Sequence, residues 1–435
     1  MTNCCYPKDL KELRSQVLEN KHILVSGAQS STVIPFSRQD SMDHCLGDSK
    51  HICLQSMAPS IKIEGSIASI AGAVSWKELR AAASQFDLDV PFWPTDQSAF
   101  VISGIATSAT GERSFHYGHL RDYIDSLSVM NHKGEVEVFY GSDSFEKIFD
   151  NEELDKLGSY NKKLKAYDSF KNPPFPIFEN PLELFIGTEG QLGIIVRCEL
   201  RLVPKKDSVH ILYPIAEWEK SEQIIDYSLK ARDCREYILS TEFFDRHCLD
   251  LVEETPLRKL DHIAFEVIED SLAEFICDMD LEEDFITIVS EDQFSKIRVN
   301  IPRAINEYLS HNQMTKKGTD VQVTPEQFSD LISKYRDLTK YGISYILFGH
   351  LGDQHLHFNF LVTNDNEKKC QKLLSEFYQE IRALKISPFA EHGIGLLKQE
   401  YMTEYYTKEV KDFFMILKNK LDPNNKFFPQ GYMSV

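Results

Sequence analysis

The stretch FGHLGDQHLHFNF, residues 348–360, puts three histidines, an aspartate, a glutamine and an asparagine into a run that otherwise has the character of a buried strand. Strand alternation places His355, His357 and Asn359 on one face. The preceding glycine-containing turn can bring His350 back beside that face. Because buried polar groups need partners, the run predicts a strand–turn–strand unit with an inward polar face that holds a metal ion or a substrate.

Two imidazoles that meet one carboxylate make a common site for a divalent metal with an open position for substrate. The candidate carboxylate is Glu391, in the downstream stretch AEHGIG. Taken alone, Glu-His-Gly also fits a solvated loop, and histidines can be satisfied members of a core or a surface. Their concentration in ten residues favours the metal or substrate site.

The length of 435 residues exceeds the size at which a single hydrophobic core stops growing, so we expect two or three structural units. The composition, 42% hydrophobic and 26% charged, is that of an ordinary globular protein. A formal net charge of −19 repels phosphate backbones and anionic lipid headgroups. We therefore expect neither nucleic acid nor a membrane surface as a partner.

The cysteines are nine in number, scattered, and without a C-x-x-C pair, which favours reduced thiols in a cytoplasmic protein over a cysteine-ligated zinc site or an iron–sulfur cluster. The beginning, MTNCCYPKDL, lacks the basic-then-apolar pattern of a signal peptide. No apolar run reaches the roughly 18 residues that a membrane helix requires. The sequence thus predicts a protein without a transmembrane segment.

Apolar periodicity predicts a mixed first half. DLKELRSQVLE, residues 9–19, has helical spacing and leads into the strand-like HILVSG, while SWKELRAAASQF is expected to form a helix that opens at Ser75. A hairpin is predicted to turn at Lys133-Gly134. NPPFPIFENP blocks regular structure. Beyond residue 204, helical segments and strands such as HIAFEVIE and YILFGH predict an antiparallel sheet with helices on it, and residues 397–421 predict one or two amphipathic helices.

Glycine-rich turns mark two further stretches. GTEGQLG, residues 187–193, lies between apolar strands and can expose backbone N–H groups to a phosphate or an electron-rich ring edge. It has neither the P-loop lysine nor the G-x-G-x-x-G spacing of a dinucleotide-binding turn. SGIATSATGERSFHYGHLRD has small residues that let a large planar group lie against backbone. Each stretch by itself also fits a plain turn or a tightly packed loop.

Taken together and in order, these stretches resemble the flavin-dependent D-2-hydroxyacid dehydrogenases, the D-lactate and D-2-hydroxyglutarate branch of the vanillyl-alcohol oxidase flavoprotein superfamily. The resemblance covers nearly the whole chain. It rests on LVSGAQSST, AGAVSWKEL, PTD with ISGIATSATGERSFHYGHLRDYI, LFIGTEGQLGII, GTDVQV, FGHLGDQHLHFN, AEHGIGLLKQEY and LDPNNKFFPQG.

The resemblance implies an α+β fold in three parts. Residues 1–204 would form a PCMH-type FAD-binding domain, and residues 205–395 a substrate cap domain of antiparallel sheet and helices that carries the metal site. Residues 396–435 would form a C-terminal helical segment that returns to pack on the FAD domain.

The resemblance also assigns site residues by position. Noncovalent FAD would be held mainly through backbone, at Ser26, Gly27, Ala28, Gln29, Ser30, Ser31, Pro94, Thr95, Gly104, Thr107, Gly111, Ile186, Gly187, Glu189, Gly190, Gly193 and Ile194. A divalent metal, zinc, manganese or iron, would be bound by His350, His357 and Glu391. His392 would accept the substrate proton, with Asn359 near the substrate and Arg298 balancing its carboxylate.

The implied activity is oxidation of a small, D-lactate-like D-2-hydroxy acid to the 2-oxo acid, with hydride passing to the flavin. A separate protein, quinone or oxygen would reoxidise the flavin, and a homodimer is compatible with the sequence. The chain differs from the family in having Ala28-Gln29-Ser30 where glycine-rich sequence is usual, and Gln354-His355 where Gly-Asn is usual. The competing interpretations are a flavin enzyme of the alkylglycerone-phosphate synthase type, a metallohydrolase without flavin, and a catalytically silent binding module.

Overall fold

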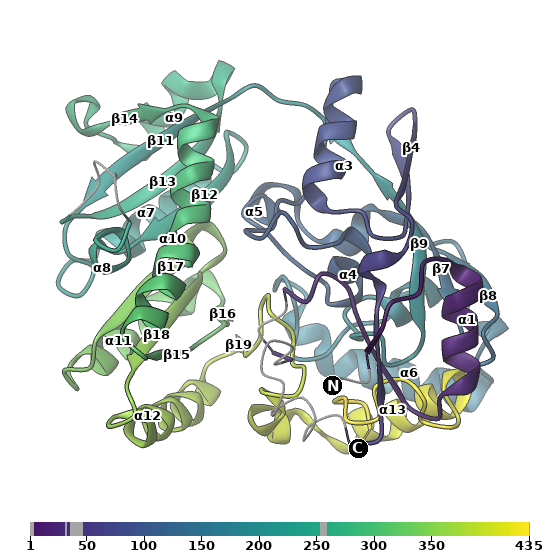
Figure 1. Cartoon of the computed structure of the whole chain (residues 1–435). Coiled ribbons are helices and arrows are strands. Elements are labelled where there is room, and N and C mark those ends of the chain that lie inside the picture. Colours follow the sequence, from purple (N-terminus) through teal and green to yellow (C-terminus); the bar gives the residue numbers. More distant parts are fainter. Residues whose placement is uncertain (1–3, 31–32, 35–46, 253–258, 435) are drawn as a thin grey trace. The chain divides into compact units, whose positions relative to one another are not determined.

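The computed structural model describes residues 4–30, 33–34, 47–252 and 259–434. These residues form two compact units (Figure 1). The first unit comprises residues 1–110, 119–205 and 391–435, and the second comprises residues 111–118 and 206–390. Within the described ranges, no helix is both long and apolar enough to span a bilayer.

The units differ from the expected domains at two places. The segment Gly111–Gly118, expected in the first domain, belongs to the second unit, because Arg113 forms a buried ion pair with Glu266, 2.6 Å between Nη2 and Oε1. The second unit ends at Ala390 and not at residue 395. The second unit ends earlier than expected because the loop after Ala390 forms its hydrogen bonds within the first unit.

The first described helix of the first unit is α1 (Leu10–Glu19), whose N-cap Asp9 accepts a hydrogen bond from the Glu12 N–H. Strands β1 (Cys4–Cys5), β3 (Lys50–Cys53) and β2 (Ile23–Ser26) form a parallel sheet. The C-terminal segment joins it, since the Phe428 N–H donates to the carbonyl of Ile23 at 2.8 Å. The two ends of the chain thus share one layer, with α1 packed on it through Leu13 and Val17.

The larger sheet of the first unit is antiparallel, in the order β4 (Ser60–Glu64), β5 (Ile67–Ala71), β9 (Ile194–Arg201), β7 (Ile124–Met130) and β8 (Val136–Tyr140). A further pair joins β6 (Leu88–Asp89) to β10 (Val203–Pro204). The predicted hairpin at Lys133-Gly134 is confirmed, because β7 pairs with β8 across this turn. The predicted helix opening at Ser75 is α3 (Trp76–Ala83), with a capping box to Glu78.

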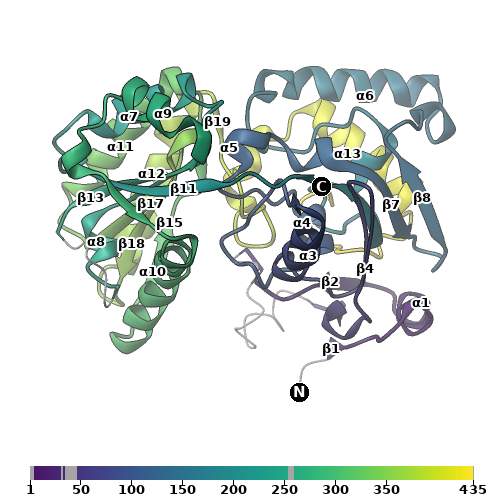
Figure 2. The ribbon, with the colours of Figure 1, turned by 90° about the horizontal axis from the view of Figure 1, so that it is seen from above.

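Three more α-helices lie in the described part of the first unit. Helix α4 (Val101–Ala106) lies in the small-residue stretch. Helix α13 (Lys408–Leu421) is the amphipathic C-terminal helix, and a 3₁₀ segment at Gln399–Tyr405 precedes it. Helix α6 (Asn151–Leu164), which the sequence reading did not predict, begins with a capping box between Asp150 and Glu153. It lies along α13 (Figure 2), where the rings of Tyr160 and Phe413 are 5.0 Å apart.

The second unit is built on one sheet of nine described strands with antiparallel neighbours, which confirms the expected antiparallel cap fold. Its main path runs β14 (Thr287–Val289), β11 (Ser208–Ile215), β13 (Asp261–Ile268), β12 (Ile238–Phe244), β17 (Tyr345–His350), β18 (His355–Val362), β16 (Val321–Val323) and β19 (Ile386–Ser387), and β15 (Thr315–Gly318) also pairs with β18.

Helices cover both faces of this sheet (Figure 2). Ala264 packs with α8 (Arg246–Leu249) and α10 (Glu291–His311), while the next residue, Phe265, meets Phe275 of α9 (Leu272–Met279). Since successive strand residues point to opposite faces, α9 and α10 lie on opposite sides. The face of α9 also carries α7 (Gln223–Asp233), α11 (Phe328–Thr339) and α12 (Glu367–Glu380). Strands buried on both faces explain why their sequences are almost continuously apolar.

A short α5 helix (Ser114–Tyr117) also belongs to the second unit. Its residue Phe115 packs so closely on Gly352 that a Cβ at this glycine would lie 2.6 Å from the ring. Gly352 stands in the turn between β17 and β18. The segment that carries α5 therefore supports the turn from which the histidines of this hairpin project.

Candidate functional site

The β17–β18 hairpin gathers the three histidines, as predicted. His350, the last residue of β17, pairs in register with His355, the first residue of β18, and His357 follows two residues later on the same face. The ring centroids of His355 and His357 are 4.6 Å apart, and those of His350 and His355 are 5.6 Å apart. A ring nitrogen from each histidine lies within 4.8 Å of the others. All three side chains are buried, which makes them a compact set of nitrogen donors.

Each imidazole has one nitrogen against an acceptor of the protein. His350 Nδ1 lies 2.6 Å from Glu242 Oε1, and His355 Nε2 lies 2.9 Å from Asp320 Oδ1. His357 Nδ1 lies 3.4 Å from the carbonyl oxygen of Thr319. In a neutral imidazole the nitrogen that donates is protonated and the other carries a lone pair. The three contacts therefore fix tautomers that leave one lone pair per ring for a ligand, as metal-binding histidines require.

The turn that connects the two strands needs unusual backbone. Gly349 has a φ of +139°, and a Cβ there would lie 2.9 Å from the carbonyl oxygen of His355. Gln354 has a φ of 53° without being glycine. Its amide nitrogen donates to Ser228 Oγ and to the carbonyl of Gly352, both at 2.9 Å. These bonds stabilise Gln354 in the left-handed backbone conformation, which residues other than glycine rarely adopt. They also keep the next residue, His355, in position.

Behind His350 runs a chain of buried charges. Glu242 contacts the guanidinium of Arg298 at 3.5 Å, and Arg298 also forms an ion pair with Glu112. Glu242, Arg298 and Glu112 are all less than one tenth exposed. Arg298 thus faces two carboxylates of the protein, and its expected contact with a substrate carboxylate stays a prediction. Asn359, on the face of His357, donates to the carbonyl of that residue at 3.2 Å.

Glu391 and His392 directly follow the second unit along the chain. The N–H of the preceding residue, Ala390, donates to the carbonyl of Asp320 at 2.9 Å. By their grouping Glu391 and His392 belong to the first unit. Their predicted roles, metal ligand and proton acceptor, stay predictions.

The residues predicted to hold FAD cluster in loops of the first unit. A Cβ on Gly27 would lie 1.9 Å from Ser103 Oγ of α4, so the loop after β2 runs against this helix. The Gly187 N–H donates to the carbonyl of Ile105 at 3.2 Å, and the Glu189 N–H donates to that of Ala106 at 2.8 Å. The loop after β2, the end of α4 and the GTEG turn therefore lie against one another.

Glu189 has a further role that the sequence did not reveal. Its carboxylate accepts from the N–H groups of Ile394 at 2.7 Å and of Gly395 at 3.0 Å. Burial raises the pKa of Glu189 to about 7, although these two N–H groups lower it. This residue joins the GTEG turn to the EHGIG loop, which explains why the loop groups with the first unit.

The other predicted cofactor residues are spread over the same unit, with two exceptions. Ser26 ends β2 and pairs with His51 through Oγ and Nε2 at 2.7 Å. Gly193 precedes β9, where a Cβ would lie 2.6 Å from Val129. Gly111 belongs to the second unit, and Ser31 lies outside the described residues. The remaining members stand in or beside the first unit's loops and elements: Ala28, Gln29, Ser30, Pro94, Thr95, Gly104, Thr107, Ile186, Gly190 and Ile194.

Two carboxylates of the site were not assigned a role from the sequence. Glu242 lies in β12, whose seven residues are all buried. Asp320 is 1% exposed and lies between β15 and β16. A single acidic residue within an apolar strand is a signal for a buried partner, and YILSTEFF contains one. The partner itself comes from a strand more than a hundred residues later in the chain, and is not predictable from spacing.

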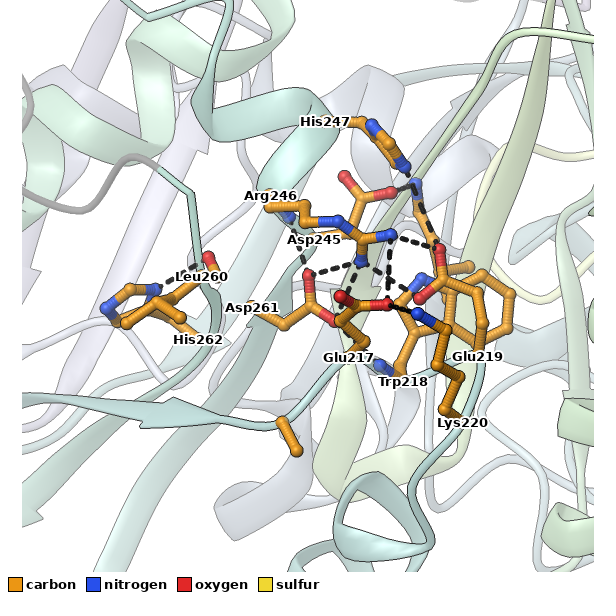
Figure 3. Close-up of polar contacts among 12 residues, drawn as sticks. Glu217, Trp218, Glu219, Lys220, Asp245, Arg246, His247, Leu260, Asp261 and His262 are labelled. Carbon is orange, nitrogen blue, oxygen red and sulfur yellow. Dashed lines mark hydrogen bonds and ion pairs between the residues drawn. The ribbon is translucent and has the colours of Figure 1, made fainter.

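A second polar cluster, half-buried, surrounds Arg246 (Figure 3) and includes Tyr345 at the first position of β17. Arg246 forms two 2.9 Å hydrogen bonds with the carboxylate of Glu219 and lies 3.3 Å from Asp261 Oδ1. Tyr345, the first residue of β17, donates its hydroxyl to Glu219, and His247 lies 3.7 Å from the same carboxylate. We call these five residues the Arg246 cluster. Its charges are opposite and in contact, so it is internally neutralised.

Two protein-family models match this chain and define its class. A model described as an FAD binding domain matches residues 17–140, in the unit that carries the glycine-rich loops. The model for the C-terminal domain of FAD linked oxidases matches residues 213–431, half of the chain. The chain therefore belongs to the FAD-linked oxidase family, and the expected flavoprotein fold is confirmed.

Curated relatives agree with this family. A probable mitochondrial D-2-hydroxyglutarate dehydrogenase of Oryza sativa subsp. indica is 25% identical over 360 residues, which cover 77% of this chain and 59% of the relative. The glycolate oxidase subunit GlcD of Bacillus subtilis is 25% identical, with 78% of this chain and 70% of the relative covered. A D-lactate dehydrogenase of Archaeoglobus fulgidus is 22% identical, with coverages of 85% and 77%. This chain thus spans about three fifths of the rice relative's length.

Among solved structures, an alkyldihydroxyacetonephosphate synthase matches with a TM-score of 0.64 and 12% sequence identity. The match covers 97% of this chain and 76% of the other. It establishes a shared fold over both units.

Proposed function

We propose that this protein oxidises a small D-2-hydroxy acid of the D-lactate type to the 2-oxo acid, with FAD and a divalent metal. The observation that carries the proposal is the β17–β18 hairpin, in which three imidazoles have tautomers fixed by Glu242, Asp320 and Thr319. In a chain of the FAD-linked oxidase family, such a donor set suits the binding of an alcohol next to a carboxylate. Relatives named for D-lactate, D-2-hydroxyglutarate and glycolate support this substrate class.

The first unit suits FAD because its loops meet at backbone. The contacts of Gly27 with Ser103, and of the GTEG turn with the end of α4, bring the glycine-rich loops together, so that a ligand bound there would meet mainly backbone. Such loops bind phosphates and flavin ring edges without charged side chains. When bound, FAD supplies the acceptor for the hydride that leaves the substrate carbon. A separate protein, quinone or oxygen would then reoxidise it.

The second unit suits a divalent metal because its donors are neutral imidazoles with supported tautomers. In the proposal His350 and His357 bind the metal, together with Glu391. The metal would supply a Lewis acid that lowers the pKa of the substrate hydroxyl and orients its carboxylate. Asn359 would lie near the substrate, and Arg298 would contribute positive charge for the substrate carboxylate.

His392 is the proposed proton acceptor. As the substrate carbon loses its hydride, the hydroxyl proton would pass to the imidazole of His392, because imidazole is the most common general base of enzymes. The alternative role is that His392 orients the neighbouring Glu391, since histidines and carboxylates commonly pair beside metal sites.

The test begins with visible absorption. The purified or reconstituted protein should be yellow with noncovalent FAD, and a colourless protein that takes up no FAD would refute the proposal. Anaerobic mixing with D-lactate, glycolate and D-2-hydroxyglutarate should then bleach the flavin, and L-lactate is the matched control. Failure of every D-2-hydroxy acid, with FAD bound, would favour a synthase of the alkylglycerone-phosphate type, whereas hydrolysis without FAD would favour a metallohydrolase.

The His392→Gln variant separates proton transfer from metal support. Flavin reduction in a single turnover should slow by roughly 10²- to 10⁴-fold, the usual contribution of a general base. Metal content and the FAD spectrum should stay normal. Reduction as fast as in the parent would exclude His392 as the base, and loss of metal would assign it to the orientation of Glu391.

A further inference from the structure

The hairpin contains one histidine more than the family resemblance assigns to the metal. His355 stands where the family usually has asparagine, and its ring lies between those of its two neighbours, 5.6 Å from His350 and 4.6 Å from His357 between centroids. It is fully buried. This residue belongs to this chain and not to the motif, so its function has to be read from its surroundings.

The contact with Asp320 determines which nitrogen of His355 can bind a ligand. Nε2 lies 2.9 Å from Asp320 Oδ1, and Asp320 is itself 1% exposed. A carboxylate accepts hydrogen bonds, so Nε2 carries the proton and Nδ1 carries the lone pair. The Nδ1 atoms of His350 and His357 face Glu242 and the carbonyl of Thr319, so these rings present Nε2 in the same way. All three rings are buried, and a ligand atom from each lies within 4.8 Å of the others, which suits a single metal ion.

We propose that His355 is a metal ligand, so that the second unit by itself supplies three imidazoles to the ion. The inference rests on the proposed function for the existence of the metal site, and adds a ligand and a metal preference to it. Metal–nitrogen bonds are about 2.1 Å long, so small ring rotations bring donors within 4.8 Å of one another onto one ion.

Three imidazoles also determine the class of metal. Imidazole suits zinc and other later transition metals, whereas magnesium and calcium prefer oxygen ligands. The site should therefore prefer Zn²⁺ or Co²⁺ strongly over Mg²⁺. Asp320 acts as a positioning residue for His355, in the same way as Glu242 does for His350.

The experiment measures metal binding by the full chain and not turnover. The protein is stripped with a chelator and titrated with Zn²⁺ by calorimetry and with Co²⁺ by visible absorption. His355→Asn, which installs the family residue, should weaken Zn²⁺ binding by at least about 100-fold, because removal of supporting partners alone weakens it by roughly 10- to 100-fold. The Co²⁺ absorption bands should shift and weaken, as expected for one nitrogen ligand fewer.

The matched control is His262→Asn, another buried histidine of the same sheet, whose Nδ1 contacts the carbonyl of Leu260 at 3.0 Å. It should leave both metal readouts unchanged. If His355→Asn keeps the parent's Zn²⁺ affinity and Co²⁺ spectrum, His355 is a structural partner of Asp320 and the inference is overturned.

A third variant covers the case in which His355→Asn fails to fold. Asp320→Asn keeps the ring and removes the fixed tautomer, and should weaken Zn²⁺ binding by roughly 10- to 100-fold. Unchanged binding in this variant would also overturn the inference. Failure of the proposed function shows itself differently, as absence of FAD or of reduction by hydroxy acids, and leaves these metal titrations interpretable.

Discussion

The two ends of strand β17 carry polar clusters of similar composition, one half-buried around Arg246 and one buried around the histidines. At Tyr345, the Arg246 cluster places a guanidinium directly between the carboxylates of Glu219 and Asp261 (Figure 3). At His350, the carboxylates of Glu242 and Asp320 stand behind the imidazoles and not among them. At Tyr345 a fixed guanidinium neutralises the carboxylates and stabilises the fold. At His350 the carboxylates hold imidazole nitrogens in place, although Glu242 also contacts the guanidinium of Arg298 at 3.5 Å.

The largest effect should come from the histidine end. His357→Ala removes a proposed ligand, so metal binding should be lost and turnover should fall by roughly 10³-fold or more, since a metal supplies several kcal/mol of charge stabilisation. FAD should stay bound, because its predicted loops lie in the first unit. Metal analysis measures the loss of the ion, and the flavin spectrum measures the retention of FAD. His262→Ala is the control. Metal content equal to the parent's would remove His357 from the site.

At the other end, Arg246→Met should act on stability. Removal of the guanidinium leaves the carboxylates of Glu219 and Asp261 without their cation, and loss of a half-buried charged hydrogen-bond partner costs roughly 1–3 kcal/mol. Two measurements on this variant, denaturant unfolding for stability and metal titration for affinity, distinguish the roles of the two ends of β17. Arg303→Met, which breaks an exposed pair with Glu307, should change stability by less than about 1 kcal/mol. If the folded Arg246→Met protein binds the metal much more weakly than the parent, the Arg246 cluster does not act on stability alone.

The third prediction concerns support behind the metal. Glu242→Gln keeps the size of the side chain but no longer holds the His350 proton by charge, so Zn²⁺ affinity should fall roughly 10-fold to 100-fold. Glu266→Gln breaks the ion pair with Arg113 elsewhere in the unit, and serves as a control for general destabilisation. Equal metal affinities in these two variants would show that Glu242 acts only on the fold.

The smallest effect is a pH dependence confined to the Arg246 cluster. Burial opposes ionisation of Glu219, but hydrogen bonds from His247, Arg246 and Tyr345 hold its pKa far below the ordinary value. Its stabilisation is therefore complete above the unfolded pKa of about 4.3 and is lost as the pH falls. The hydrogen bond to Glu219 raises the pKa of His247, so that contribution is complete below about pH 6.5 and is lost as the pH rises.

The two contributions predict that stability from this cluster is greatest between about pH 5 and 6.5. Unfolding free energies of the parent and of Glu219→Gln, measured from pH 4 to pH 8, should differ most in this window. A difference that is constant across the range would show that the cluster acts through packing alone.

Local sequence determined much of this protein. Apolar periodicity and caps at Asp9 and Ser75 defined helices α1 and α3, and strict alternation with a glycine turn defined the β17–β18 hairpin and its histidine face. These features depend on neighbours within a few residues, so the sequence carries them directly. Helix α6 was missed although its capping box and the helical spacing of Leu157, Tyr160 and Leu164 are present in the sequence, because the polar residues between them and the proline-rich segment that follows obscured the pattern.

Tertiary structure decided which charges meet. Glu242 reaches His350 and Asp320 reaches His355 because strands distant in sequence lie side by side, and the grouping of Gly111–Gly118 with the second unit follows from the Arg113–Glu266 pair. The sequence by itself determined that three histidines share one face of a hairpin. Only the folded sheet decided that carboxylates stand behind them, because pairing between remote strands depends on burial of the whole sheet and leaves no periodic trace in the chain.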